Sequence, residues 1–318
     1  MARLITFGYS LLRGNSISRL STSSIRALST TQRHDHQHQE ENDEESGDRN
    51  THFGFETVRE DQKSQRVYGV FENVAENYDL MNDAMSVGVH RLWKDLFIER
   101  LGPMPGMKLL DVAGGTGDIT LRFLNALETT NKEEGFMDQR SFTEADEELE
   151  SIPKNHVTVS DINQAMLDVG KARLDKLDFL NTDISWLRAD AEALPLADNS
   201  YDVYTIAFGI RNCTHIEKVL DEAYRVLKPG GRFMCLEFSH VNNPLLSTLY
   251  DLYSFQAIPV MGQVIAGDYR SYQYLVESIR QFPDQETFCA MIEDAGFRMV
   301  THENLSFGVA AIHSGFKV

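Results

Sequence analysis

Glycines cluster in the segment 109–118, LLDVAGGTGD, which begins with a short apolar run. The glycines at positions 114, 115 and 117 allow a tight turn and a close approach of the backbone to a ligand, where any Cβ would collide. Loops of this kind bind cofactors of several classes. The segment therefore predicts a cofactor site in which the backbone of Gly115 and Gly117 approaches the ligand.

Spacing and charge narrow the class of cofactor. The dinucleotide pattern GxGxxG, started at Gly115, needs glycine at position 120, where the chain has threonine. The carboxylates of Asp111 and Asp118 would repel a pyrophosphate, whereas they suit a ligand that carries ammonium and sulfonium groups. We therefore predict S-adenosylmethionine as the cofactor, and a nicotinamide oxidoreductase is disfavoured.

Two further acidic residues follow short apolar runs. Asp161 comes directly after the run 157–160, where a carboxylate can accept both hydroxyls of a ribose. The alternative is an N-cap for a helix that begins at Ile162. Asp190 and Ala191 follow the run 185–189, and they suit an adenine amino group and ring, with a simple turn as the alternative.

The elements that must position these residues alternate between strand and helix. Helices are expected over 119–127, after Asp161 with an apolar stripe of Ile162, Met166 and Val169, and over 216–227. Strands are expected over 108–112, 157–160, 185–189, 201–207, 232–238, 297–304 and 309–317. This alternation predicts an α/β fold, a doubly wound and mostly parallel sheet with helices on both faces. Ligands of such sheets bind at the carboxyl ends of the strands, which are the ends that carry Asp111, Asp161 and Asp190.

Composition excludes some functions and divides the chain. A net charge of -18 over 318 residues disfavours a nucleic-acid partner. Residues 1–33 carry five arginines, many Ser and Thr, and no carboxylate, which predicts a mitochondrial transit peptide. Residues 34–62 read as a disordered acidic leader and 63–318 as the main domain, with an acidic surface insertion at 128–152. The three cysteines have neither disulfide nor metal-site spacing.

Four separated motifs resemble one family. They are Tyr78-Asp79-Leu80-Met81-Asn82 with Ser86, His90 and Trp93; the segment 208–212, FGIRN; the segment 225–233, RVLKPGGRF, with Glu237 and Ser239; and the segment 268–275, DYRSYQYL. From about Val67 to the C-terminus the chain resembles the ubiquinone/menaquinone biosynthesis C-methyltransferases. The resemblance implies a seven-stranded, Rossmann-like class I fold, and it implies that Thr116, Asp161, Asp190 and Ala191 bind S-adenosylmethionine. Ala207 departs from the family, which tends to have serine there.

The resemblance also implies an acceptor and a set of catalytic residues. With a transit peptide, the acceptor is expected to be a polyprenylated methoxy-benzoquinol of ubiquinone biosynthesis, methylated on ring carbon without a metal. Arg211 would stabilise the phenolate and Asn212 would orient it, while water, His90 or Tyr78 would take the proton. The alternatives are a structural ion pair of Arg211 with Asp79 or Glu237, and a merely hydrogen-bonded His90. Two alternative functions remain for the whole chain: a demethylmenaquinone-type methyltransferase and a non-catalytic scaffold subunit.

An apolar segment follows the predicted strand 232–238. Residues 242–275 form a second insertion, rich in leucine and aromatic residues, which we expect to cover the substrate and guide its prenyl tail. The same segment is expected to touch the matrix side of the mitochondrial inner membrane, where the protein would meet other coenzyme-Q biosynthesis proteins. Ordinary core packing or a homodimer interface are the alternatives.

Overall fold

A computed structural model describes residues 49–74, 78–133, 154–177, 179 and 181–318. The predicted transit peptide 1–33, the first part of the leader and residues 134–152 of the acidic insertion lie outside these residues. The insertion was expected to begin at residue 128, but α4 (Asp118–Glu133) continues as a helix through 128–133.

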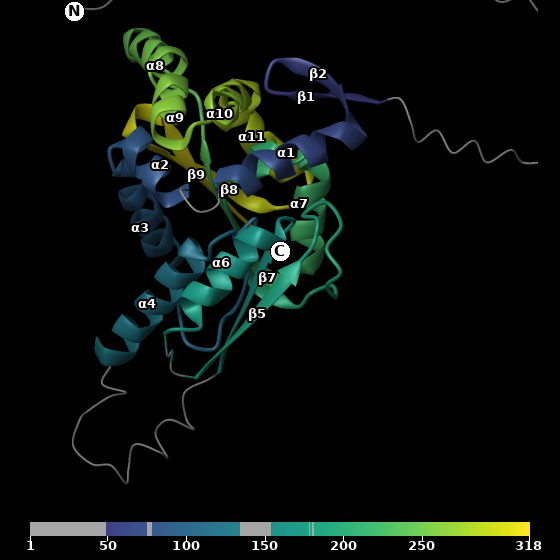
Figure 1. Cartoon of the computed structure of the whole chain (residues 1–318). Helices are drawn as coiled ribbons and strands as arrows, with labels where there is room; N and C mark the ends of the chain where they lie inside the picture. Colours follow the sequence, from purple (N-terminus) through teal and green to yellow (C-terminus); the bar gives the residue numbers. More distant parts are fainter. Residues whose placement is uncertain (1–48, 75–77, 134–153, 178, 180) are drawn as a thin grey trace, which may run out of the picture. The chain divides into compact units, whose positions relative to one another are not determined.

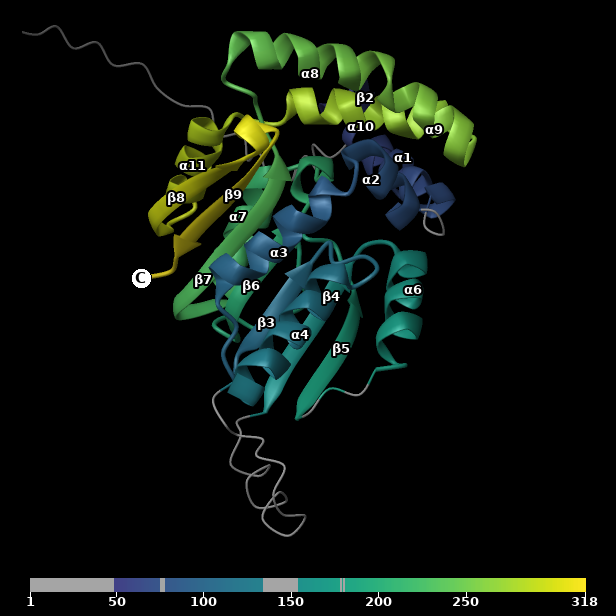
Figure 2. The same cartoon turned by 90° about the vertical axis from the view of Figure 1, so that its left-hand side faces the viewer.

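The described residues form a seven-stranded sheet in the order β5-β4-β3-β6-β7-β9-β8 (Figures 1 and 2). Its first five strands pair in parallel, and β9 runs antiparallel between β7 and β8. The strands are β3 (Lys108–Val112), β4 (Asn155–Asp161), β5 (Thr182–Arg188), β6 (Tyr201–Ala207), β7 (Leu227–Phe238), β8 (Arg298–Leu305) and β9 (Ala310–Phe316). The predicted α/β class and mostly parallel sheet are confirmed.

Helices cover both faces because successive strand residues alternate in direction. Leu109 belongs to a core with side chains of α3 (Val89–Leu101), α4 and α6 (Gln164–Leu174). Leu110 belongs to the opposite core, with side chains of α7 (Ile216–Val226) and α11 (Gln285–Asp294). Figure 2 shows α3 and α4 in front of the sheet and α7 behind it.

The predicted apolar stripe of α6 is confirmed at Met166 and wrong at Ile162 and Val169. Ile162 and Val169 are 39% and 40% exposed, and the buried residues of the helix are Met166, Leu167, Gly170 and Leu174. The helix begins later than expected because Asn163 is its N-cap and accepts hydrogen bonds from the backbone N–H groups of residues 165 and 166. Ile162 therefore precedes the helix and is not part of its buried face.

A cap of helices lies over one end of the sheet (Figure 2). It consists of α1 (Glu60–Val74), α2 (Tyr78–Ser86), α8 (Pro244–Gln256), α9 (Ile258–Ala266) and α10 (Tyr269–Gln281). Among the described residues, no helix is long and apolar enough to cross a membrane.

The expected disordered leader reaches too far. From Asn50 the chain forms a hairpin of β1 (Asn50–Phe53) and β2 (Glu56–Arg59), and α1 begins at Glu60. The ring of Phe53 stacks on Tyr274 of α10 with centroids 4.2 Å apart, and the N–H of Phe55 donates to Glu277 at 3.0 Å. These contacts give a polar segment enough partners to order it.

Candidate active site

The glycine loop connects β3 to α4 at the end of the sheet that the helices cap. Its turn is closed by the N–H of Gly117, which donates to the carbonyl of Gly114 at 2.8 Å. Gly115 and Gly117 have φ angles of +51° and +72°, which favour glycine. The N–H of Gly115 donates to Oδ2 of Asp161 at 2.9 Å, so the loop is held against the end of the neighbouring strand β4.

Asp111 is completely buried beneath the loop. Its two carboxylate oxygens accept hydrogen bonds from the hydroxyls of Thr120 at 2.8 Å and Thr205 at 3.0 Å, which ties β3 to α4 and β6. Burial raises the pKa of Asp111 to about 6. A direct contact between this carboxylate and a ligand cation was expected, but the structure gives both oxygens protein partners.

Asp161 sits at the end of β4 with both oxygens facing backbone N–H groups. One oxygen accepts from Gly115 and the other from Asn163 at 2.8 Å. The alternative of an N-cap at Asp161 is wrong, since the cap is Asn163. Burial raises the pKa of Asp161 to about 6. Ribose binding by this carboxylate stays a prediction.

Asp190 makes the turn that was its alternative role. Its Oδ1 accepts from the N–H of Glu192 at 2.9 Å, and its carbonyl accepts from the N–H of Ala193 at 3.1 Å. The side chain remains exposed. A contact of Asp190 and Ala191 with adenine therefore stays a prediction that this geometry permits.

These residues surround one cavity, called the glycine-loop cavity below. Its wall includes Asp111, Gly115, Thr116, Asp161, Asp190, Ala191 and Ala207, whereas the lining does not include Gly117. Sequence reasoning missed the contribution of α1, which adds Ser64, Val67 and Tyr68. The sequence carries a signal for this helix, since apolar residues recur periodically from Val67 onward, but a single sequence does not show that the helix lies over the glycine-loop cavity.

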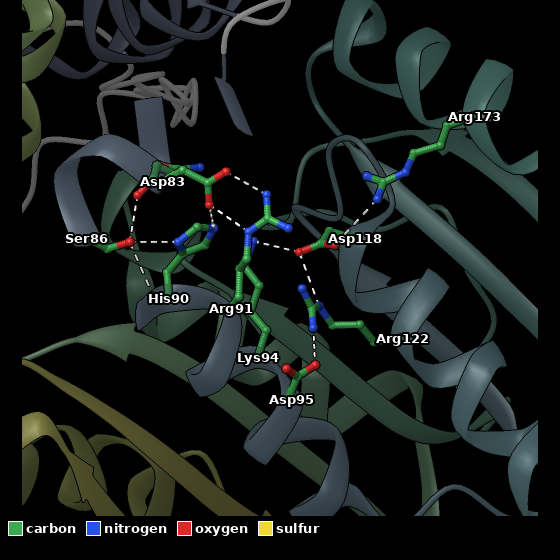
Figure 3. Close-up of polar contacts among 10 residues, drawn as sticks. Asp83, Ser86, His90, Arg91, Lys94, Asp95, Asp118, Arg122 and Arg173 are labelled. Atoms are coloured by element: carbon green, nitrogen blue, oxygen red, sulfur yellow. Dashed lines mark hydrogen bonds and ion pairs between the residues drawn. The ribbon is translucent and has the colours of Figure 1, made fainter. Parts of the chain in front are cut away.

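Asp118 is already paired, contrary to the expectation that it would meet a ligand ammonium. It lies 2.8 Å from Nζ of Lys94, 3.4 Å from Nε of Arg122 and 3.8 Å from Nη2 of Arg173 (Figure 3). Burial acts to raise its pKa, but these cations hold the pKa of Asp118 below its ordinary value. Both Lys94 and Asp118 line the glycine-loop cavity.

A second cavity, called the apolar cavity below, lies beneath α2, α8, α9 and α10. Its wall includes Trp93, Phe238, Tyr250, Tyr253, Ile258 and Tyr272. Lys94 and Phe208 line both cavities, so the two are neighbours. The segment 242–275 supplies much of the apolar wall, and its role in covering a substrate stays a prediction.

Arg211 reaches the apolar cavity and forms the ion pair that was its alternative role. Its Nη1 donates to Glu237 at 2.9 Å and to the carbonyl of Phe208 at 2.5 Å. The carboxylate is fully buried; burial raises the pKa of Glu237, against the lowering effect of the guanidinium. Among the described residues, Nε of Arg211 has no hydrogen-bond partner although it is buried.

The other three expected catalytic residues do not all line the same cavity. His90 lines the apolar cavity with its Nδ1 2.7 Å from the hydroxyl of Ser86, and burial and the charge of Lys94 lower its pKa (Figure 3). Asn212 instead lines the glycine-loop cavity, and its Oδ1 accepts from the hydroxyl of Tyr274 at 3.0 Å. Tyr78 opens α2, and its side chain lies outside the described part of the structure.

Comparison with known proteins identifies the family. The model of the ubiE/COQ5 methyltransferase family matches residues 59–317. The chain belongs to this family. It is 58% identical over 277 residues to the mitochondrial 2-methoxy-6-polyprenyl-1,4-benzoquinol methylase of Bos taurus, covering 84% of each chain. The proteins of the same name from Drosophila melanogaster and Homo sapiens are 58% and 57% identical, covering 85% and 84% of this chain and 86% and 84% of theirs.

The cofactor of a ubiE/COQ5 methyltransferase is S-adenosylmethionine, and the glycine-loop cavity fits it. Gly115 leaves the backbone bare beside Asp161, and a Cβ built there would lie 3.2 Å from Met166 and 3.7 Å from Oδ2 of Asp161. Carboxylates along the wall suit ribose hydroxyls and a cationic donor, and disfavour phosphate groups. No group of three or more His, Cys, Asp or Glu residues within the described ranges could hold a metal.

Proposed function

We propose that this protein transfers a methyl group from S-adenosylmethionine to a ring carbon of a polyprenylated methoxy-benzoquinol in mitochondrial ubiquinone biosynthesis. The observation that carries the proposal is that two cavities share wall residues: one is built on the glycine loop with several carboxylates in its wall, and the other is an apolar cavity beneath α8, α9 and α10. One suits the donor and the other suits a prenylated ring. The name shared by the mammalian and insect relatives supports the same acceptor.

On the donor side, the proposed roles follow from position. Asp161 would accept the ribose hydroxyls, Asp190 and Ala191 would meet the adenine, and Thr116 would contact the donor from the glycine loop. When bound, S-adenosylmethionine supplies an electrophilic methyl group on a sulfonium. That methyl must face the neighbouring cavity, which places it near Phe208, a residue that both cavities share.

On the acceptor side, Arg211 is proposed to stabilise the phenolate. Its buried Nε–H lacks a protein acceptor among the described residues, and its fixed positive charge lowers the energy of a developing oxyanion. A guanidinium cannot take the proton, since its pKa exceeds about 12. His90, whose pKa is lowered by burial, is neutral near pH 7–8 and is the proposed acceptor of the proton, with Tyr78 as a second candidate.

Asn212 is given a different role from the one expected. Because its side chain lies in the glycine-loop cavity and binds the hydroxyl of Tyr274, we propose that it positions Tyr274 in the apolar cavity. The hydrogen bond thus joins the walls of the two cavities.

The location of the protein is proposed to be the matrix face of the mitochondrial inner membrane. The exposed side chains Leu245, Leu249 and Leu252 recur along one side of α8, and Val260 and Val264 are exposed on α9. An apolar stripe of this kind suits a membrane surface, from which a prenyl tail could reach the cavity below. Association with other coenzyme-Q biosynthesis proteins and a homodimer belong to the same proposal.

The test is transfer of labelled methyl from S-adenosylmethionine to synthetic 2-methoxy-6-prenyl-1,4-benzoquinol, with the position of the label read by mass spectrometry and NMR. The expected product carries the methyl on ring carbon. Faster turnover of a demethylmenaquinol would favour the alternative acceptor. Binding of S-adenosylhomocysteine without turnover of either quinol would favour a scaffold subunit.

A further inference from the structure

Lys94 is a buried lysine at the border of the two cavities. It lies in the middle of α3, is 6% exposed, and lines both the glycine-loop cavity and the apolar cavity. Its Nζ donates to Asp118 at 2.8 Å, and Asp118 lines the glycine-loop cavity but is absent from the apolar lining. The ammonium group therefore faces the glycine loop, while the aliphatic stem faces the apolar cavity.

Asp118, the acceptor of this ammonium, is shared by three cationic side chains. The guanidinium groups of Arg122 and Arg173 share Asp118 with Lys94, and Arg122 also pairs with Asp95 (Figure 3). An ammonium has three N–H donors, and in the described part of the chain Asp118 is the acceptor that Lys94 binds. Asp118 also opens the 16-residue helix α4, whose N-terminus adds positive potential.

We infer that Lys94 binds the α-carboxylate of the methionine part of S-adenosylmethionine. The inference rests on the proposed assignment of the glycine-loop cavity to the donor. A single carboxylate fits better than a phosphate group, because the same cavity is lined by Asp111 and Asp161. Burial of Lys94 removes competing water, which strengthens a charge-assisted hydrogen bond.

The assignment connects donor binding to the acceptor side. His90 lies one turn before Lys94 on α3 and lines the apolar cavity. A carboxylate held by Lys94 would thus lie about one helical turn from His90, at the border of the acceptor cavity. Lys94 is in this sense a binding residue for the donor that also borders the acceptor cavity.

The experiment compares two ligands that differ in one group. S-adenosylhomocysteine has the carboxylate, whereas its decarboxylated analogue, 5′-deoxy-5′-(3-aminopropylthio)adenosine, retains the adenosine, the sulfur and the ammonium. Titration calorimetry on the full chain should show that the Lys94→Met variant binds S-adenosylhomocysteine about 10- to 100-fold more weakly than the wild type does. The affinity of Lys94→Met for the analogue should equal that of the wild type.

A matched control and a second variant separate this role from a structural one. Arg122→Met removes a cation from Asp118 that does not line the cavity, and it should leave the ratio of the two affinities unchanged. Lys94→Arg should still bind S-adenosylhomocysteine more tightly than the decarboxylated analogue. This variant provides the test if Lys94→Met does not fold.

Three outcomes would overturn the inference. They are an equal loss of affinity for both ligands in Lys94→Met, an unchanged preference in that variant, and loss of the preference in Lys94→Arg. If the wild type bound neither ligand, the donor assignment of the cavity would fail as well, which distinguishes the two failures.

Discussion

At the scale of single residues, the site contains buried acids whose ionisation is costly. Burial raises the pKa of both Asp111 and Asp161 to about 6, so each is protonated more readily in the folded chain than in the unfolded one. Their effect on stability is therefore greatest below the unfolded pKa near 4, and it is lost as pH rises through about 6. Above pH 6 the fold holds charged carboxylates that a cationic ligand would stabilise.

The first prediction concerns donor affinity and pH. Ribose hydroxyls that donate to Asp161 favour its ionised form, so affinity for S-adenosylhomocysteine should be greatest above pH 6 and fall below it, approaching about tenfold per pH unit for one proton. Asp161→Asn should bind more weakly above pH 6 and depend less on pH, with Asp111 responsible for the remainder. Calorimetry from pH 4.5 to 8 measures this, with exposed Asp175→Asn as the control. A pH profile in Asp161→Asn identical to that of the wild type would exclude Asp161.

The second prediction separates stability from catalysis at Arg211. Removing one partner of a buried ion pair leaves an unpaired charge, so Arg211→Met should lower the free energy of unfolding by about 3–5 kcal/mol. The double variant Arg211→Met/Glu237→Gln should recover part of that stability. Turnover should remain low in both variants, while S-adenosylhomocysteine binds both as it binds the wild type.

Denaturant unfolding, calorimetry and methyl-transfer assays on the same preparations test this prediction. If the double variant regained wild-type kcat along with its stability, Arg211 would be purely structural. Loss of donor affinity in step with turnover would instead place its effect on the glycine-loop cavity.

At the scale of elements, the sequence predicted the features that depend on apolar periodicity and on glycine and proline at the ends of elements. The strands were found because parallel strands buried on both faces read as apolar runs, and the glycine loop and Asp161 were placed correctly at their ends. The buried face of α6 was predicted only at Met166, because Ile162 precedes the helix and Val169 is exposed. Ser64 and Tyr68 of α1 were missed because only tertiary packing brings this helix to the glycine-loop cavity.

The third prediction concerns the hairpin of β1 and β2, which composition alone predicts to be disordered. Phe53 stacks on Tyr274, whose hydroxyl binds Asn212, so Phe53→Ala should loosen the wall of the apolar cavity. The KM for the benzoquinol should rise several-fold, while affinity for S-adenosylhomocysteine stays constant. Exposed Thr57→Ala on β2 is the control. A change in donor affinity without a change in KM would contradict this role.

At the scale of the whole molecule, charge and apolar surface oppose each other at a membrane. The chain carries a net charge of -18, and removal of its arginine-rich first segment would make the remainder more negative. An anionic membrane surface therefore repels the protein over about one Debye length. The exposed side chains of α8 and α9 must supply the attraction if the proposed location is correct.

The fourth prediction follows from that opposition. Binding to vesicles with anionic lipid should strengthen as salt screens the repulsion, the reverse of what a basic anchor shows. The triple variant Leu249→Ser/Leu252→Ser/Val264→Ser should abolish flotation at every salt concentration, because it removes the apolar area that the bilayer takes up. Met299→Ser, which removes an equally exposed apolar side chain from β8, should float as the wild type does. If the triple variant floated normally but sedimented as a smaller species, the stripe would be a homodimer interface, and the membrane would have to be contacted elsewhere.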